Sequence, residues 1–256
     1  MLTEIIKIIT IPFLGTALGA ACVFLVKKNL NPIFQKSMNG FAAGIMIAAS
    51  VWSLIIPAIE LAEADYKHPF LPAAIGLWIG IVFFFITDKL LLINKDKMNI
   101  DSFKQKQFLP LLAVAIHNIP EGMALGVVFA AWLSGNEIIT YSAILALAIG
   151  IGVQNFPEGS IISVPLYVSG TTRTRSFFLG ILSAVAETVG TVVTLLAASY
   201  VLPLLPYLMC FAAGAMIYVV IGELCPEMSE GGISHVSLLM FAFGFSLMMV
   251  LDVALG

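Results

Sequence analysis

The sequence predicts an all-α polytopic membrane protein, a bundle of eight transmembrane helices in one domain that spans 1–256. Of the 256 residues, 60% are hydrophobic and only 11% are charged, whereas roughly a quarter of the residues in a soluble domain are charged. The apolar stretches also reach about twenty residues, the length that crosses a bilayer as a helix. They are continuous, whereas the strands of a membrane β-barrel alternate between polar and apolar residues.

Eight apolar stretches qualify as transmembrane helices. The first apolar run follows Lys7 and is as long as a full span, so we interpret it as a helix and not as a cleavable signal. The only long polar stretch, about 94–107, separates the third and fourth spans and is expected to be a flexible cytoplasmic loop. The predicted spans are about 5–26, 40–59, 71–93, 108–133, 138–168, 177–201, 206–221 and 236–253.

Basic residues orient these spans. Ten of the twelve lysines and arginines lie in or beside alternate connections, and the other two are Lys67 and Lys7, the latter near the amino terminus. Because positively charged loops stay in the cytoplasm, both termini are expected on the extracellular or periplasmic side of the cell membrane. The ten residues are Lys27, Lys28, Lys36, Lys89, Lys95, Lys97, Lys104, Lys106, Arg173 and Arg175.

Three glutamates lie deep inside predicted spans four, five and six, namely Glu121, Glu158 and Glu187. A charged side chain at the bilayer centre costs about 2.5–3.5 kcal/mol even on the lenient insertion scale. No lysine or arginine lies at that depth, and the three carboxylates would also repel one another. The sequence therefore indicates that they bind metal ions or protons.

The pattern Asn-x-Pro-Glu-Gly occurs twice, in spans four and five. His117 precedes Glu121 by four residues, and Gln154 precedes Glu158 by four, so each pair shares one helix face. Imidazole with carboxylates suits zinc, iron, manganese or nickel, whereas a site of oxygen ligands alone would suit magnesium or calcium. Two glutamates able to bridge indicate a binuclear centre, with Asn118 and Asn155 adding amide oxygens.

The two prolines of the pattern predict kinks in helices four and five. Pro120 and Pro157 lack an amide hydrogen, so the carbonyl four residues earlier loses its helical partner. Such a break is tolerated in a bilayer where protein, water or a ligand satisfies the freed group. Gly122 and Gly159 follow and allow the two helices to approach closely.

These segments resemble the ZIP family of divalent-metal transporters, in particular its bacterial GufA-like branch. The resemblance covers essentially the whole chain. It is carried by "HNIPEG" at 117–122 and "QNFPEG" at 154–159, with support from "GFAAGIMIAAS" at 40–50, "SAVAETVG" at 183–190 and "AGAMIYVVIGELCPE" at 213–227.

The resemblance implies a two-metal site and an elevator-like motion of spans one, four, five and six against spans two, three, seven and eight. Some relatives have His or Asp where this chain has Gln154 and Asn155, which implies weaker or broader metal selection here. The first implied metal position comprises Met46, His117, Glu121, Gln154 and Glu158, and the second comprises Asn118, Glu121, Asn155, Glu158 and Glu187.

We therefore expect a transporter, not an enzyme, that moves zinc into the cytoplasm, with cadmium, iron, manganese or another divalent metal as alternative substrates. Two other functions stay open: an intramembrane metal-dependent hydrolase, which lacks support because no His-Glu-x-x-His signature occurs, and a metal-sensing receptor. The expected partners are divalent metal ions and the lipid bilayer, with a homodimer left open. The net charge of −3 gives no indication of a nucleic-acid partner.

Overall fold

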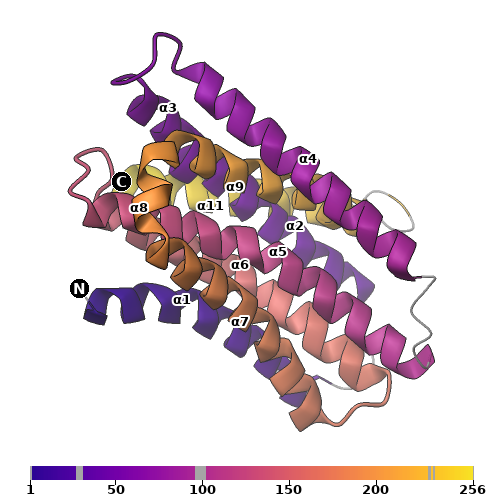
Figure 1. The fold of residues 1–256 in the computed structure, drawn as a ribbon. Coiled ribbons are helices and arrows are strands. Elements are labelled where there is room, and N and C mark those ends of the chain that lie inside the picture. Colours follow the sequence, from indigo (N-terminus) through magenta and orange to yellow (C-terminus); the bar gives the residue numbers. More distant parts are fainter. Residues whose placement is uncertain (1, 27–30, 96–101, 230–231, 233, 256) are drawn as a thin grey trace.

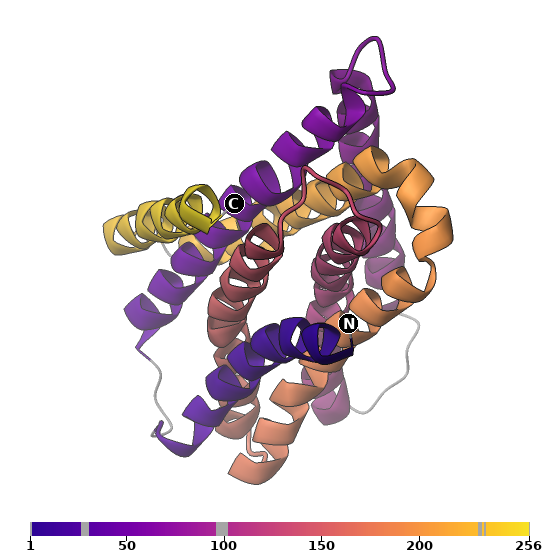
Figure 2. The same ribbon diagram turned by 90° about the vertical axis from the view of Figure 1, so that its left-hand side faces the viewer.

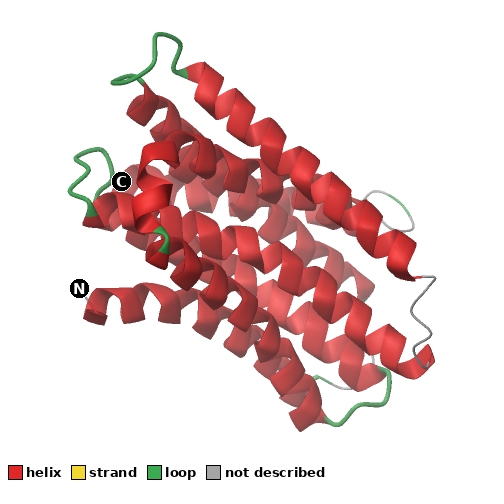
Figure 3. Cartoon of the chain, in the orientation of Figure 1, coloured by secondary structure: helices red, strands yellow, loops and turns green. Residues whose placement is uncertain are grey.

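A computed structural model gives the structure of the protein. It describes the backbone of residues 2–26, 31–95, 102–229, 232 and 234–255, and the side chains of these residues except those of 2, 91–95, 102–117 and 199. The described residues form helices and connecting turns with no β-strand (Figure 3). Both ends of the chain lie at the same end of the helix bundle (Figure 1).

Eleven α-helices, some joined end to end by short 3-10 or π segments, account for this part of the chain. Seven helical stretches of the described residues are long and apolar enough to cross a membrane. In α5, the apolar stretch Asn118–Leu133 is shorter. The protein is therefore the all-α polytopic membrane protein that the sequence predicts. The elements are α1 (Leu2–Ala21), η1 (Cys22–Phe24), α2 (Pro32–Ala49), η2 (Ser50–Ile55), α3 (Ile56–Ala62), α4 (Phe70–Lys95), α5 (Ser102–Leu133), α6 (Tyr141–Val168), α7 (Arg173–Leu196), α8 (Ala198–Val201), η3 (Leu202–Leu204), α9 (Leu205–Val219), η4 (Val220–Leu224), α10 (Cys225–Ser229) and α11 (His235–Leu255).

Side-chain caps explain where several helices begin. The Asn31 side chain accepts a hydrogen bond from the amide of Ile33 at 2.9 Å, and Pro32 occupies the first turn, so α2 starts before the predicted span at 40. Thr140 caps α6 by accepting from the amide of Ala143 at 3.0 Å. This cap places the start of α6 at Tyr141, three residues after the predicted start of the span.

Two π segments replace α-helical geometry in the second and seventh spans. Segment η2 precedes Pro57, and η4 precedes Pro226 and carries the seventh helical stretch past its predicted end at 221. By contrast, α6 is assigned as helix without a break across Pro157. The π segments thus lie in the second and seventh spans, where the sequence predicts no irregularity, and π segments are frequent at functional sites.

Glycines bring two pairs of helices into backbone contact in the set formed by α1, α5, α6 and α7. A Cβ placed on Gly19 of α1 would lie 1.9 Å from the carbonyl oxygen of Phe156 in α6. One placed on Gly122 of α5 would lie 1.9 Å from the carbonyl oxygen of Glu187 in α7, and one on Gly159 of α6 would lie 2.2 Å from that of Thr16 in α1. The prediction that these two glycines bring α5 and α6 together is therefore wrong, because each faces a different neighbouring helix. Small residues permit such close approach of helix backbones in a membrane, and α1–α6 and α5–α7 are the most extensive contacts in this set.

The same device joins α2 to α11 and α4 to α9. A Cβ on Gly44 of α2 would lie 2.1 Å from the carbonyl oxygen of Phe241 in α11, and one on Gly80 of α4 would lie 2.2 Å from that of Phe211 in α9. Figure 2 shows the indigo α1 and orange α7 on one side of α5 and α6, with the purple α2 on the other side. We call α1, α5, α6 and α7 the first helix set, and α2 to α4 with α9 to α11 the second.

Contacts between the two sets are less extensive than those within the four glycine-joined pairs. At one such contact, Gly150 of α6 faces the side chain of Met248 in α11, and a Cβ on this glycine would lie 2.2 Å from the methionine sulfur. Met248 is fully buried. A flexible methionine side chain therefore fills the space that a second backbone occupies in the pairs within each set.

Candidate metal centre

The three acids predicted to lie inside the membrane come from three helices of the first set. Glu121 lies on α5, Glu158 on α6 and Glu187 on α7. Glu121 is 1% exposed and Glu187 is 3% exposed, whereas Glu158 is partly exposed. Burial of carboxylates among apolar helices is costly unless hydrogen bonds or cations compensate the charge.

The amide of Gln154 compensates the first carboxylate. Its Nε2 donates a hydrogen bond of 2.7 Å to Oε1 of Glu121, which links α6 to α5. Gln154 is fully buried. The sequence placed Gln154 on one helix face with Glu158; the structure pairs its nitrogen with the acid of the neighbouring helix.

The next residue along α6 compensates the third acid. Nδ2 of Asn155 donates a hydrogen bond of 2.6 Å to Oε2 of Glu187 on α7 and a longer one of 3.4 Å to the carbonyl oxygen of Pro12 on α1. Successive residues point about 100° apart around a helix. Gln154 and Asn155 therefore reach acids on different sides of α6.

Asn118 on α5 is held differently. Its Nδ2 donates a hydrogen bond of 3.2 Å to the backbone carbonyl of Ser183 on α7. The donor end of this amide is thus tied to the backbone and not to a carboxylate. We call Asn118, Glu121, Gln154, Asn155 and Glu187 the carboxylate–amide cluster.

Five oxygens of this cluster accept no hydrogen bond from the described residues although they are buried. Such groups are uncommon, because buried polar atoms in proteins are nearly always paired. Carboxylate and amide oxygens are ligands for divalent cations, so the donor set fits a metal ion. The five atoms are Oδ1 of Asn118, Oε2 of Glu121, Oε1 of Gln154, Oδ1 of Asn155 and Oε1 of Glu187.

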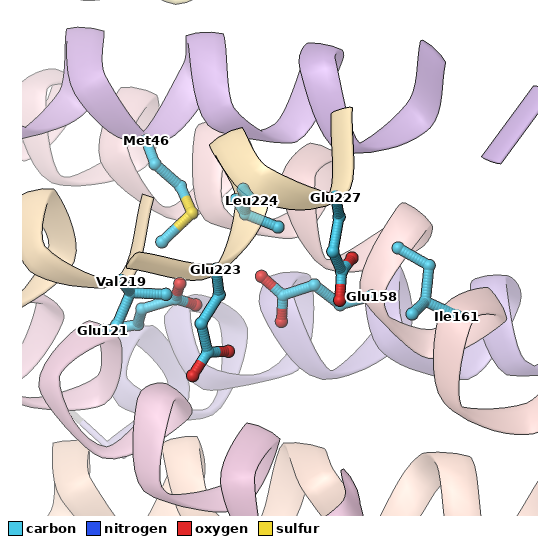
Figure 4. A pocket seen from close by; sticks show the side chains of 8 residues that line it. All are labelled: Met46, Glu121, Glu158, Ile161, Val219, Glu223, Leu224 and Glu227. Atoms are coloured by element: carbon cyan, nitrogen blue, oxygen red, sulfur yellow. The ribbon is translucent and has the colours of Figure 1, made fainter. Parts of the chain in front are cut away.

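A cavity connects the cluster with the second helix set (Figure 4). Met46 of α2, Glu223 of η4 and Glu227 of α10 line it together with Glu121 and Glu158, and Figure 4 shows Glu223 between the two first-set acids. The centres of water molecules can occupy a volume of about 60 Å³ in this cavity. A volume of about 10–15 Å³, measured in the same way, is enough for one water. The cavity therefore has room for a partly hydrated cation.

A second cavity lies near the end of the bundle that holds the termini. Ser53 of η2, Glu60 of α3 and Asp252 of α11 line it. Ser53 Oγ donates a hydrogen bond of 2.6 Å to Oδ1 of Asp252, which is 9% exposed. Each π segment thus contributes a side chain to one of the two cavities, since Glu223 of η4 lines the first.

The structure brings most of the predicted site residues together. Met46, Glu121 and Glu158 line one cavity, and hydrogen bonds join Gln154 to Glu121 and Asn155 to Glu187. The predicted ligand His117 lies outside the described side chains. Among the residues with described side chains, no three His, Cys, Asp or Glu form a metal-binding group.

Sequence reasoning missed two polar residues that position acids. Asn39 of α2, which is 1% exposed, donates a hydrogen bond of 2.6 Å from Nδ2 to Oε2 of Glu227. Ser53 does the same for Asp252. Asn39 lies at the start of an apolar run and Ser53 lies within one. This polar position was the only feature of the sequence that could have indicated their role.

Comparison with known proteins bears on the function of the whole chain. A family model described as ZIP zinc transporter matches residues 93–252. Zinc transporter ZIP11 of Xenopus tropicalis is 33% identical, with 94% of each chain covered. Zinc transporter GufA of Myxococcus xanthus is 34% identical over 94% of this chain and 96% of its own, and zinc transporter ZIPB of Bordetella bronchiseptica is 33% identical over 95% and 79%.

Proposed function

Since the chain belongs to the ZIP zinc transporter family, we propose that it carries zinc or a similar divalent cation into the cytoplasm through the carboxylate–amide cluster. Transport of metal ions across the membrane follows from the family, and it replaces the hydrolase and receptor alternatives. The observation that carries the assignment to this cluster is its five buried oxygens without hydrogen-bond donors among the described residues. Ligand exchange along a path, and not bond chemistry, is the mechanism.

Two neighbouring cation positions suit the arrangement around α6. Gln154 faces Glu121 on α5, and Asn155 faces Glu187 on α7. Glu158 lines the cavity one turn farther along α6. As the family resemblance implies, a binuclear site would use Glu121 and Glu158 as shared ligands, with Met46, His117 and Gln154 completing one position and Asn118, Asn155 and Glu187 the other.

The two cavities suggest the route. If the termini lie outside the cell, as the basic loops predict, the cavity with Asp252 and Glu60 faces the exterior. The cavity with Glu223 and Glu227 then faces the cytoplasm, because α10 follows η4 toward the other end of the bundle. Acids near both ends of the path would attract cations and receive them in turn.

The glycine contacts support an elevator-like motion. Backbone contacts join α1 to α6 and α5 to α7 in the first helix set, and α2 to α11 and α4 to α9 in the second. Between the sets, the packing of Gly150 against Met248 uses a flexible side chain. The first set, which carries the cluster, would move as a unit against the second.

Uptake of metal into proteoliposomes tests this function. We expect zinc uptake to be inhibited by cadmium and by other soft divalent ions more strongly than by magnesium or calcium, because a histidine and a thioether accompany the oxygen ligands. We also expect slower uptake at pH 5.5 than at pH 7.5, because protons compete with metal for carboxylates. Inhibition of zinc uptake by magnesium as strong as that by cadmium would contradict the proposed ligand set.

The outer cavity provides a separate prediction. Asp252→Asn keeps the shape of the side chain and its hydrogen bond with Ser53 but removes a charge from the outer cavity. We expect the KM for zinc to rise about three- to tenfold, the effect of about 1 kcal/mol of lost attraction, with little change in the maximal rate. Glu63→Gln, at an exposed position near this end, is the matched control. An unchanged KM would exclude Asp252 from the route.

A further inference from the structure

Two amides of the cluster can exist in two orientations with opposite chemistry. An amide side chain presents two N–H donors on one side and an acceptor oxygen on the other. Gln154 and Asn155 turn their nitrogens toward Glu121 and Glu187. If a cation binds these carboxylates, the same amides contribute to it only by turning their oxygens inward.

Rotation between the two orientations is possible for both residues. The terminal torsion of Gln and Asn is broad and roughly two-fold, so a half-turn exchanges oxygen and nitrogen at little torsional cost. The oxygens of both amides accept no hydrogen bond from the described residues. A half-turn of either amide therefore breaks only the hydrogen bonds made by its nitrogen.

Asn118 provides the contrast. Its nitrogen is tied to the carbonyl of Ser183, and its oxygen accepts no hydrogen bond from the described residues. This amide can offer its oxygen to a cation without turning. The cluster thus contains one amide, that of Asn118, whose nitrogen donates to the backbone, and two, those of Gln154 and Asn155, whose nitrogens donate to carboxylates.

We propose that Gln154 and Asn155 are switching amides: they donate to Glu121 and Glu187 between transport events and rotate to coordinate the cation when it binds. The inference rests on the proposed function, since it concerns the same cluster. In the hydrogen-bonded arrangement the N–H groups compensate both buried carboxylates without a cation. The first helix set can then return across the membrane without cargo, and the cation is released when the amides turn back.

Exchange of each amide for the acid of the same shape tests the switch. Gln154→Glu and Asn155→Asp remove the donor and add a ligand charge. A charged hydrogen bond contributes about 1.5–3 kcal/mol, so we expect both the KM for zinc and the maximal rate of uptake to fall by about tenfold or more. Asn136→Asp, in a turn where the carboxylate can accept the same backbone hydrogen bonds, is the matched control and should transport normally.

A second measurement needs no variant. In wild-type protein with ¹⁵N-labelled Asn and Gln side chains in nanodiscs, zinc should accelerate hydrogen exchange at the amides of Gln154 and Asn155 and leave that of Asn118 protected. If the wild-type protein transports no zinc, the proposed function itself is contradicted. Zinc transport with unchanged exchange at Gln154 and Asn155, or variants with an unchanged maximal rate, would overturn the switch alone.

Discussion

Glu121→Gln and Glu158→Gln should each lower the initial rate of zinc uptake by about a hundredfold or more, since loss of one partner of a buried charged contact costs roughly 3–5 kcal/mol. Both side chains line the cavity next to Met46 (Figure 4). Glutamine has the shape of glutamate, and Gln154 can turn to accept a hydrogen bond from an amide at 121. We therefore expect both variants to fold and to lose transport through loss of ligand charge.

The matched control is an acid of the same type outside the path. Glu63 is exposed beyond the end of α3, so Glu63→Gln should leave the rate within about twofold of wild type, the usual range for surface changes. All variants are reconstituted at equal density, and uptake is followed with a zinc-sensitive dye inside the vesicles. Retention of more than half of the wild-type rate by Glu121→Gln would exclude this carboxylate as a ligand of the cargo.

Substitution of the glycines that join helix backbones should destabilise the whole protein. Gly19→Ala and Gly80→Ala would place a methyl group 1.9 and 2.2 Å from a backbone carbonyl oxygen of the adjacent helix. The helices must then separate. Overpacking of this kind typically costs 1–3 kcal/mol or more, which lowers the melting temperature by roughly 5–10 °C in a chain of this size. Thermal unfolding in detergent, followed by tryptophan fluorescence, measures the effect.

Gly150→Ala is the matched control for these two substitutions. Its methyl group would meet the sulfur of Met248, 2.2 Å away, and this side chain can adopt another rotamer. The melting temperature should change by less than about 2 °C, because a side-chain rearrangement costs well under the overpacking values. A large loss of stability in Gly150→Ala would show that the contact between the helix sets is as rigid as the contacts within them.

Residue patterns predicted the helical fold and two of its buried acids for physical reasons. Apolar runs of span length have few alternatives in a bilayer. Glu121, Glu158 and Glu187 stood out because charge is costly at that depth, and Glu121 and Glu187 are indeed among the buried polar residues. The repeated Asn-x-Pro-Glu-Gly pattern indicated helices that contribute to one site.

Pairings between distant residues were not predictable in the same way. Asn39 and Glu227 are 188 residues apart, and Ser53 and Asp252 are 199 apart, so helical periodicity carries no information on either contact. The pairing of Gln154 with Glu121 depends on how α5 and α6 turn toward each other. The π segments precede Pro57 and Pro226. A proline by itself does not predict such a segment, because α6 is helical across Pro157.

Zinc uptake by the wild-type protein is the most direct test of the account. Purified wild-type protein and the Glu121→Gln variant are reconstituted separately into liposomes that contain a zinc-sensitive dye. Zinc is then added outside both samples and outside protein-free liposomes. We predict saturable uptake by wild-type vesicles and uptake by Glu121→Gln vesicles close to that of protein-free liposomes. Wild-type vesicles that fill no faster than protein-free liposomes, or equally fast filling of both protein samples, would contradict transport through the carboxylate–amide cluster.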